Sequence, residues 1–93
     1  MEVVFTFSET AAAIKGEAAL EEGGLAVKVM PRPPVLGAGC GISLRLPEAE
    51  ADEGLRLLAA AGLEAQGLYD RLEREGAAVY RPRERAGQAG PPT

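Results

Sequence analysis

The sequence predicts an α+β fold: a ferredoxin-like β-α-β-β-α-β two-layer sandwich, in which a four-stranded antiparallel sheet carries two helices on one face. Two observations lead to this prediction. Segments with strand and helix patterns follow one another in that order, and the 93 residues fit one domain. We expect residues 1–70 to form this domain and residues 71–93 to be a C-terminal extension, partly helical and then disordered.

The first strand and the first helix have clear local signals. Val3–Phe7 alternates β-branched and aromatic residues, as a half-buried strand does. Ser8–Thr10 offers hydroxyl groups that cap a helix and an acid suited to its positive end. Residues 11–22 are strong helix formers until the Gly23-Gly24 pair. Gly16 falls on the inner side of this helix and would let it approach the sheet closely.

A loop rich in proline and glycine separates the second and third strands. Residues 25–30 and residues 42–46 both alternate in the manner of strands. Prolines stiffen the first half of the intervening residues 31–41, and glycines free the second half for unusual backbone angles.

The second helix is expected to begin at Pro47, because proline suits a first helical turn and an acidic run follows it. Gly62 ends this helix. Its apolar stripe consists of Ala51, Leu55, Leu58 and Ala59. Leu57 lies on the far side from that stripe and is expected to be exposed.

A fourth strand is expected from Leu63 to about Tyr69, with Gly67 as a bulge. Residues 71–75 have a pattern that would extend a short helix. From Pro82 onward the sequence has no apolar period, and we expect disorder there.

The composition excludes several classes of site. Histidine and tryptophan are absent, so the chain holds no Ser–His–Asp or Cys–His arrangement and lacks the commonest metal ligand. The single cysteine, Cys40, cannot form an internal disulfide or a zinc site. We expect no cofactor and no bound metal. The start of the chain resembles neither a secretion signal nor a membrane span, which predicts a cytoplasmic protein.

The charge distribution argues against nucleic acid as a ligand. Residues 1–70 carry eleven acidic and five basic side chains, a net −6, and residues 71–93 carry three acids and five arginines, a net +2. Phosphate contacts require clustered Lys or Arg. The arginines of the tail are interleaved with acids, which is typical of a solvated segment.

Cys40 is the reactive candidate because it stands in the glycine loop. In a ferredoxin-like arrangement this loop lies at the same end of the sheet as Ser8 and Thr10, at the start of the first helix. A helix N-terminus supplies unpaired N–H groups that stabilise a thiolate. Gly39 and Gly41 would add exposed N–H groups and leave the sulfur open. The alternative is a buried structural thiol, since unpaired cysteine often behaves as a small apolar residue.

Three weaker signals have more ordinary interpretations. Gly37-x-Gly39-x-Gly41 is similar to a phosphate loop but opens a strand, whereas the dinucleotide fingerprint opens a helix. The acidic run at residues 48–53 is better explained by a solvated first helical turn than by a metal site. Arg32 would hold an anion near the loop or, as we favour, be an ordinary surface arginine.

Six short motifs follow one another across roughly residues 3–70. They are Val4-Phe5-Thr6-Phe7, Ala13-Ile14-Lys15-x-Glu17, Gly24-Leu25-x-Val27, Pro31-x-Pro33, Cys40-Gly41-x-x-Leu44-Arg45 and Gly62-Leu63-x-x-x-Gly67-Leu68-Tyr69. In order and spacing they resemble the DUF3343 family of small bacterial proteins, also described as selenium/sulfur carrier-like. The tail after about Asp70 lies outside the resemblance.

The resemblance implies a carrier that holds sulfur or selenium as a persulfide or selenopersulfide on Cys40. Its partners would be proteins such as a cysteine desulfurase or a selenium-handling enzyme, and it would be a carrier and not a self-sufficient enzyme. Two alternatives stay open. One is a non-catalytic interaction or regulatory module, associating through a sheet edge or face as a homodimer or with a partner, with a structural cysteine. The other is a thiol redox sensor, for which the chain has no resolving cysteine.

Overall fold

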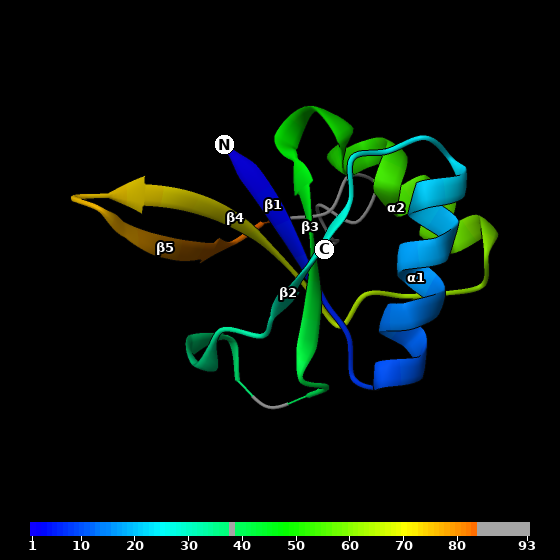
Figure 1. The fold of residues 1–93 in the computed structure, drawn as a ribbon, viewed down its shortest axis with the longest axis horizontal. Coiled ribbons are helices and arrows are strands. Elements are labelled where there is room, and N and C mark those ends of the chain that lie inside the picture. Colours follow the sequence, from blue (N-terminus) through cyan, green and yellow to red (C-terminus); the bar gives the residue numbers. More distant parts are fainter. Residues whose placement is uncertain (38, 84–93) are drawn as a thin grey trace, which may run out of the picture.

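The computed structural model describes residues 1–37 and 39–83. Five strands and two α-helices make up most of it (Figure 1). In chain order they are β1 (Glu2–Thr6), α1 (Thr10–Glu22), β2 (Lys28–Pro31), β3 (Ile42–Pro47), α2 (Ala51–Ala60), β4 (Gly67–Arg74) and β5 (Ala77–Pro82). Two short 3-10 helices, η1 (Pro34–Leu36) and η2 (Glu48–Glu50), lie before β3 and α2.

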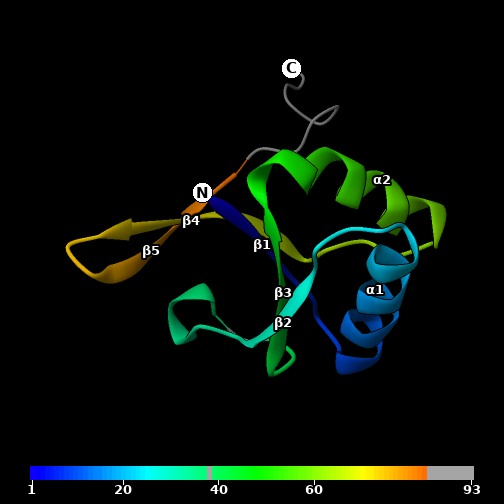
Figure 2. The same ribbon diagram turned by 45° about the horizontal axis from the view of Figure 1, so that its top comes forward.

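The strands form one sheet in the order β2-β3-β1-β4-β5, and each neighbouring pair is antiparallel. Both helices lie on the same side of this sheet (Figures 1 and 2). The predicted α+β architecture is therefore confirmed, and the first four strands have the ferredoxin-like order. The predicted strand number was wrong, because β5 adds a fifth strand beside β4.

The β4–β5 hairpin replaces the short helix that was expected at residues 71–75. β4 begins at Gly67 and not at Leu63, and it continues to Arg74, past the domain boundary expected at residue 70. Glu75 and Gly76 have φ of 52° and 83°, which is the left-handed backbone of a two-residue hairpin turn. The hairpin projects beyond the rest of the sheet (Figure 1). The disorder expected from Pro82 onward falls, after Arg83, outside the described residues.

Smaller expectations also needed correction. β2 is confined to Lys28–Pro31 and does not begin at residue 25. Gly67 is no bulge, because it pairs in continuous register with Thr6. Leu57 is half-buried and packs against the core, covering Gly23. Thr10 is the first residue of α1, and no side-chain hydrogen bond caps that helix.

The core lies between the sheet and the helices, and two glycines let the helices approach. Phe5, Phe7 and Leu44 are fully buried in this layer. A Cβ atom at Gly16 of α1 would lie 3.2 Å from Phe7 Cζ and 3.3 Å from Leu44 Cδ1. At Gly54 of α2 it would lie 2.8 Å from Leu46 Cδ1. The predicted role of Gly16 is thus confirmed.

The face of the sheet opposite α1 and α2 buries two hydroxyl groups. Thr6 and Ser43 are register partners on β1 and β3, and both are fully buried. Among the described residues, neither hydroxyl oxygen has a hydrogen-bond partner. Buried polar groups without partners destabilise a fold, so this pair is a local weakness.

Ion pairs join neighbouring strands of the sheet. Arg45 and Arg71 both reach the Glu2 carboxylate, each at 3.3 Å. Arg83, just after β5, lies 2.6 Å from Asp70 and 3.1 Å from Glu48. Hydrogen bonds to Asp70 and then to Glu48 raise the pKa of the Arg83 guanidinium above its ordinary value. Arg83 therefore joins β5 and β4 to the start of the second helical segment.

Charge is divided between the two layers of the described residues. The helical segments and their loops, residues 9–24 and 48–66, carry nine acidic and two basic side chains, a net −7. The strands and their connecting loops carry seven basic and four acidic side chains, a net +3. The acids of the helical layer are Glu9, Glu17, Glu21, Glu22, Glu48, Glu50, Asp52, Glu53 and Glu64.

Candidate functional site

Cys40 lies at the end of the loop that joins β2 to β3. The Arg32 backbone N–H donates to the Gly41 carbonyl at 3.0 Å and closes this loop at its base. The loop contains the η1 turn, where Leu36 is buried and Val35 is 76% exposed. The prolines and the glycines of residues 31–41 therefore belong to one connection between β2 and β3.

The thiol of Cys40 is buried and acts as a hydrogen-bond donor. Cys40 is 6% exposed and belongs to the main core cluster. Its backbone N–H donates to the Phe7 carbonyl at 3.2 Å, and its Sγ–H donates to the Ile42 carbonyl at 2.9 Å. The first bond puts the Cys40 backbone beside Phe7, which directly precedes Ser8. The second bond requires the protonated thiol, so formation of a thiolate breaks it.

Arg32 fastens the loop to the rest of the fold. Its Nε donates to the Gly37 carbonyl at 2.8 Å and its Nη2 to the Leu36 carbonyl at 2.9 Å. Its Nη1 donates to the Phe7 carbonyl at 3.2 Å, the same oxygen that accepts the Cys40 N–H. The sequence favoured a surface arginine here. Instead, all three guanidinium nitrogens bind backbone carbonyls, and Arg32 positions the loop that carries Cys40.

The two glycines beside Cys40 have different surroundings. A Cβ atom at Gly39 would collide with the Arg32 guanidinium and would lie 2.9 Å from the Phe7 carbonyl oxygen. Gly41 is exposed, and a Cβ atom there would have no neighbour within 4 Å. Gly39 is therefore needed for close packing against Arg32, whereas Gly41 has open space beside it.

Ser8 and Thr10 are exposed and, among the described residues, their hydroxyl groups make no hydrogen bond to Cys40. Glu9 precedes the helix in an extended conformation without a capping side-chain bond. The loop and the start of α1 thus lie at the same end of β1, but the hydroxyl groups do not reach the sulfur.

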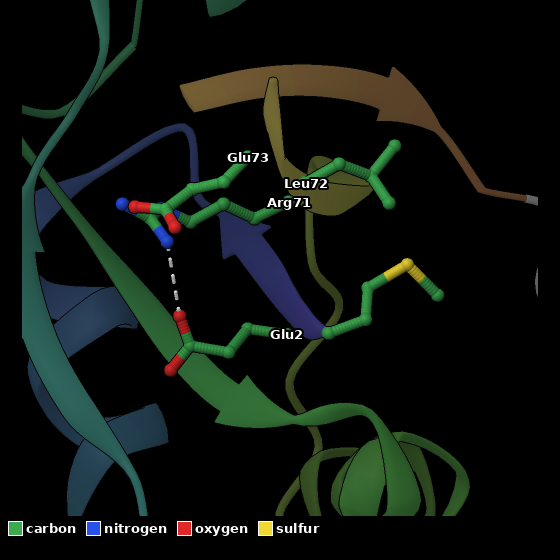
Figure 3. A pocket seen from close by; sticks show the side chains of 5 residues that line it. Glu2, Arg71, Leu72 and Glu73 are labelled. Atoms are coloured by element: carbon green, nitrogen blue, oxygen red, sulfur yellow. Dashed lines mark hydrogen bonds and ion pairs between the residues drawn. The ribbon is translucent and has the colours of Figure 1, made fainter. Parts of the chain in front are cut away.

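A cavity of about 370 Å³ lies at the opposite end of β1 (Figure 3). It is lined by Met1, Glu2, Arg71, Leu72 and Glu73, and the Arg71–Glu2 ion pair crosses it. Cys40 does not line it. Within residues 1–37 and 39–83, no three His, Cys, Asp or Glu side chains gather closely enough to hold a metal ion. No helix in this part of the chain is long and apolar enough to cross a membrane.

The fold and the loop describe a small α+β protein with one cysteine held in a hairpin loop. Over residues 2–70 the chain matches the family described as "Putative Se/S carrier protein-like". The chain belongs to this family, and membership supports a carrier-type role in general. No curated protein and no solved structure gives a significant match.

Proposed function

We propose that this protein carries a sulfur or selenium atom as a persulfide or selenopersulfide on Cys40 and passes it between partner enzymes. Family membership over residues 2–70 carries the proposal. Cys40 is the only cysteine in the chain, so it is the only side chain able to hold such an atom as a persulfide.

The transfer needs no oxidant, because the arriving atom is already at the required oxidation level. The Cys40 sulfur attacks the terminal sulfur of a persulfide on a donor such as a cysteine desulfurase. A new S–S bond forms on Cys40, the donor's S–S bond breaks, and the proton lost from Cys40 is taken up by the donor thiolate. An acceptor thiolate then repeats the exchange and restores Cys40. Selenium would follow the same route.

The loop must move for this exchange to occur. Cys40 is 6% exposed, and its Sγ–H is engaged by the Ile42 carbonyl, so an in-line approach to the sulfur requires the loop to open. The bonds that resist opening are those from Arg32 to the carbonyls of Phe7, Leu36 and Gly37. A donor protein that contacts the exposed Val35 would touch the same loop.

The test is a loading experiment on the full chain. The protein is incubated with a cysteine desulfurase and cysteine, and its intact mass is then measured without reductant. We expect one added sulfur atom, located on Cys40 by peptide mapping and absent from the Cys40→Ser variant. A parallel incubation with a selenocysteine-cleaving enzyme and selenocysteine compares the two cargoes. If neither donor adds an atom and native Cys40 also resists alkylation, the carrier proposal fails.

A second candidate function is an interaction module with a structural cysteine, and the burial of Cys40 favours it. Because Cys40 is buried, Cys40→Ser places a hydroxyl in the core and should lower the free energy of unfolding by about 1–3 kcal/mol. For such a module, the loading experiment would show no adduct. An adduct on Cys40 rejects this alternative.

A further inference from the structure

Among the described residues, β5 is the last strand of the sheet, and no further strand pairs with its outer side. Five of its six residues are exposed, and only Tyr80 is partly buried. Residues 77–80 carry no charged side chain. An uncharged edge strand is a template for another strand, and native proteins usually protect such edges with charge, proline or a covering segment.

The pairing with β4 fixes which backbone groups of β5 point outward. The Arg83 N–H donates to the Leu68 carbonyl at 2.8 Å, and a two-residue turn joins Arg74 to Ala77. Because bonding alternates along an antiparallel pair, residues 77, 79 and 81 direct their backbone groups toward β4. Ala78, Tyr80 and Pro82 direct theirs outward. Pro82 has no N–H, so the edge offers two donors, at Ala78 and Tyr80.

The opposite edge of the sheet is better protected. The Arg32 N–H bonds to the Gly41 carbonyl, so the same alternation turns the backbone groups of Val29 and Pro31 outward on β2. Pro31 has no N–H, which leaves a single donor at Val29 on a strand of four residues. The edge available for pairing is therefore β5.

We propose that β5 pairs antiparallel with β5 of a second copy of this chain, with Val79 opposite its own equivalent on the two-fold axis. In this register Ala78 and Tyr80 of each copy face Tyr80 and Ala78 of the other. Each pair exchanges two N–H···O bonds, so every outward donor is used. The sheets of the two copies then become continuous.

Charge complementarity supports a second copy of the chain as the occupant of this edge. Glu75 at the tip of one hairpin comes to the level of Arg83 in the second copy and is diagonal to its Arg81. The same contact occurs twice by symmetry. A register with Tyr80 opposite Tyr80 would move Glu75 away from Arg81, leave it diagonal to Arg83, and set Pro82, which has no N–H, against Ala78. The apolar Val79 pair lies at the centre, where like charges would be most costly.

A cross-linking experiment tests the register. Val79→Cys is introduced into the full chain in a Cys40→Ser background and exposed to a mild oxidant. A directly opposed pair without hydrogen bonds has Cα atoms about 4.5 Å apart, which suits a disulfide. We expect a disulfide-linked dimer for Val79→Cys. The matched controls are Ala77→Cys and Arg81→Cys. In the proposed register residue 77 of one copy faces residue 81 of the other, so neither cysteine faces its own equivalent. These two variants should link at least about tenfold more slowly.

Sedimentation of the unmodified chain over a range of concentrations tests the association itself. We expect a monomer–dimer equilibrium, because an interface of one strand pair is small. Ala78→Pro, at an N–H that β4 does not use, should raise the dissociation constant at least about tenfold. Glu75→Arg should also weaken the dimer, and the double variant Glu75→Arg/Arg81→Glu should restore it.

The proposal is overturned if the unmodified chain is a monomer at all concentrations, which would leave the edge to another occupant. It is also overturned if residues 77, 79 and 81 cross-link equally or if Ala78→Pro leaves the dimer unchanged. Because the cross-linking background lacks Cys40, failure of the carrier chemistry would not affect this result.

Discussion

At the scale of single residues, Arg32 holds the loop that carries Cys40. Its guanidinium binds the carbonyls of Phe7, Leu36 and Gly37, and it lies against Gly39. We predict that Arg32→Ala frees the loop and raises the rate of Cys40 alkylation in the native protein by about tenfold or more. Gly39→Ala should act in the same direction, because its methyl group would displace the guanidinium. Arg56→Ala removes an exposed arginine paired with Glu53 and should not change the rate. An unchanged rate in Arg32→Ala would contradict this role.

The buried hydroxyl groups of Thr6 and Ser43 lead to a prediction about stability. Thr6→Val keeps the shape of the side chain and removes an oxygen that has no partner. We expect the free energy of unfolding, measured in urea, to rise by about 1 kcal/mol. Ser8→Ala removes an exposed hydroxyl and should leave it within about 0.5 kcal/mol. A loss of stability in Thr6→Val would mean that the hydroxyl is bonded in solution.

The residues of the candidate site were only partly predictable from sequence. Cys40 was identified because the chain has no histidine and no other cysteine, and because Cys40 stands between glycines. The ferredoxin-like order of strands put its loop beside the start of α1. Burial of the thiol was one of two open alternatives. The role of Arg32 was missed because its partners are backbone carbonyls, which every residue has and which no sequence pattern marks.

At the scale of elements, α2 approaches the sheet through Gly54. A Cβ atom there would lie 2.8 Å from Leu46 Cδ1 and 3.2 Å from Phe5 Cε2. Alanine favours a helix over glycine by about 1 kcal/mol, but overpacking costs about 1–3 kcal/mol. We predict that Gly54→Ala destabilises the fold, and that Gly16→Ala, whose nearest contacts are 3.2 Å, destabilises it less. Thermal or urea unfolding checks the order, and a more stable Gly54→Ala would contradict it.

Local sequence signals predicted the elements that end at a glycine or have a clear alternation of apolar and polar residues. Gly23 ended α1 and the alternation of residues 42–46 identified β3, whereas the β4–β5 hairpin was missed. Its turn is Glu75-Gly76, and glutamate is an uncommon residue at the first position of such a turn. The charged residues of β4 also weaken its strand alternation. Pairing across the sheet, and not local preference, makes this segment extended.

At the scale of the whole molecule, the fold extends past the segment that matches the family. The family match ends at residue 70, whereas β4 and β5 continue to residues 74 and 82. We predict that truncation after residue 70 lowers the free energy of unfolding by at least about 2 kcal/mol, because it removes Arg71, Arg83, β5 and the second half of β4. Truncation after residue 83 is the matched control and should be tolerated. Equal stability of the two truncated chains would show that the hairpin is dispensable.

Arg83 joins three segments, and its substitution has a defined pH dependence. Arg83→Ala should cost about 1–3 kcal/mol, because it leaves Asp70, whose side chain is 16% exposed, without its cation. The pKa of Arg83 is raised in the fold. Its stabilisation is therefore fully present below the pKa of an unfolded arginine and is lost only as the pH rises through the higher folded value. The difference between the two proteins should be constant from about pH 6 to about pH 9. A difference that changes within this range would contradict the assignment.

The separation of charge between the two layers makes the molecule an electric dipole. Its negative end is the helical layer at −7 and its positive end is the sheet layer at +3. A charged protein approaching from a distance would turn this molecule before touching it, so its orientation at first encounter would be set by long-range forces and not by contact. Such steering weakens as salt shortens the range of the field. The salt dependence of an association rate would therefore show which layer a partner meets first: slower association of an acidic partner in added salt would indicate the sheet.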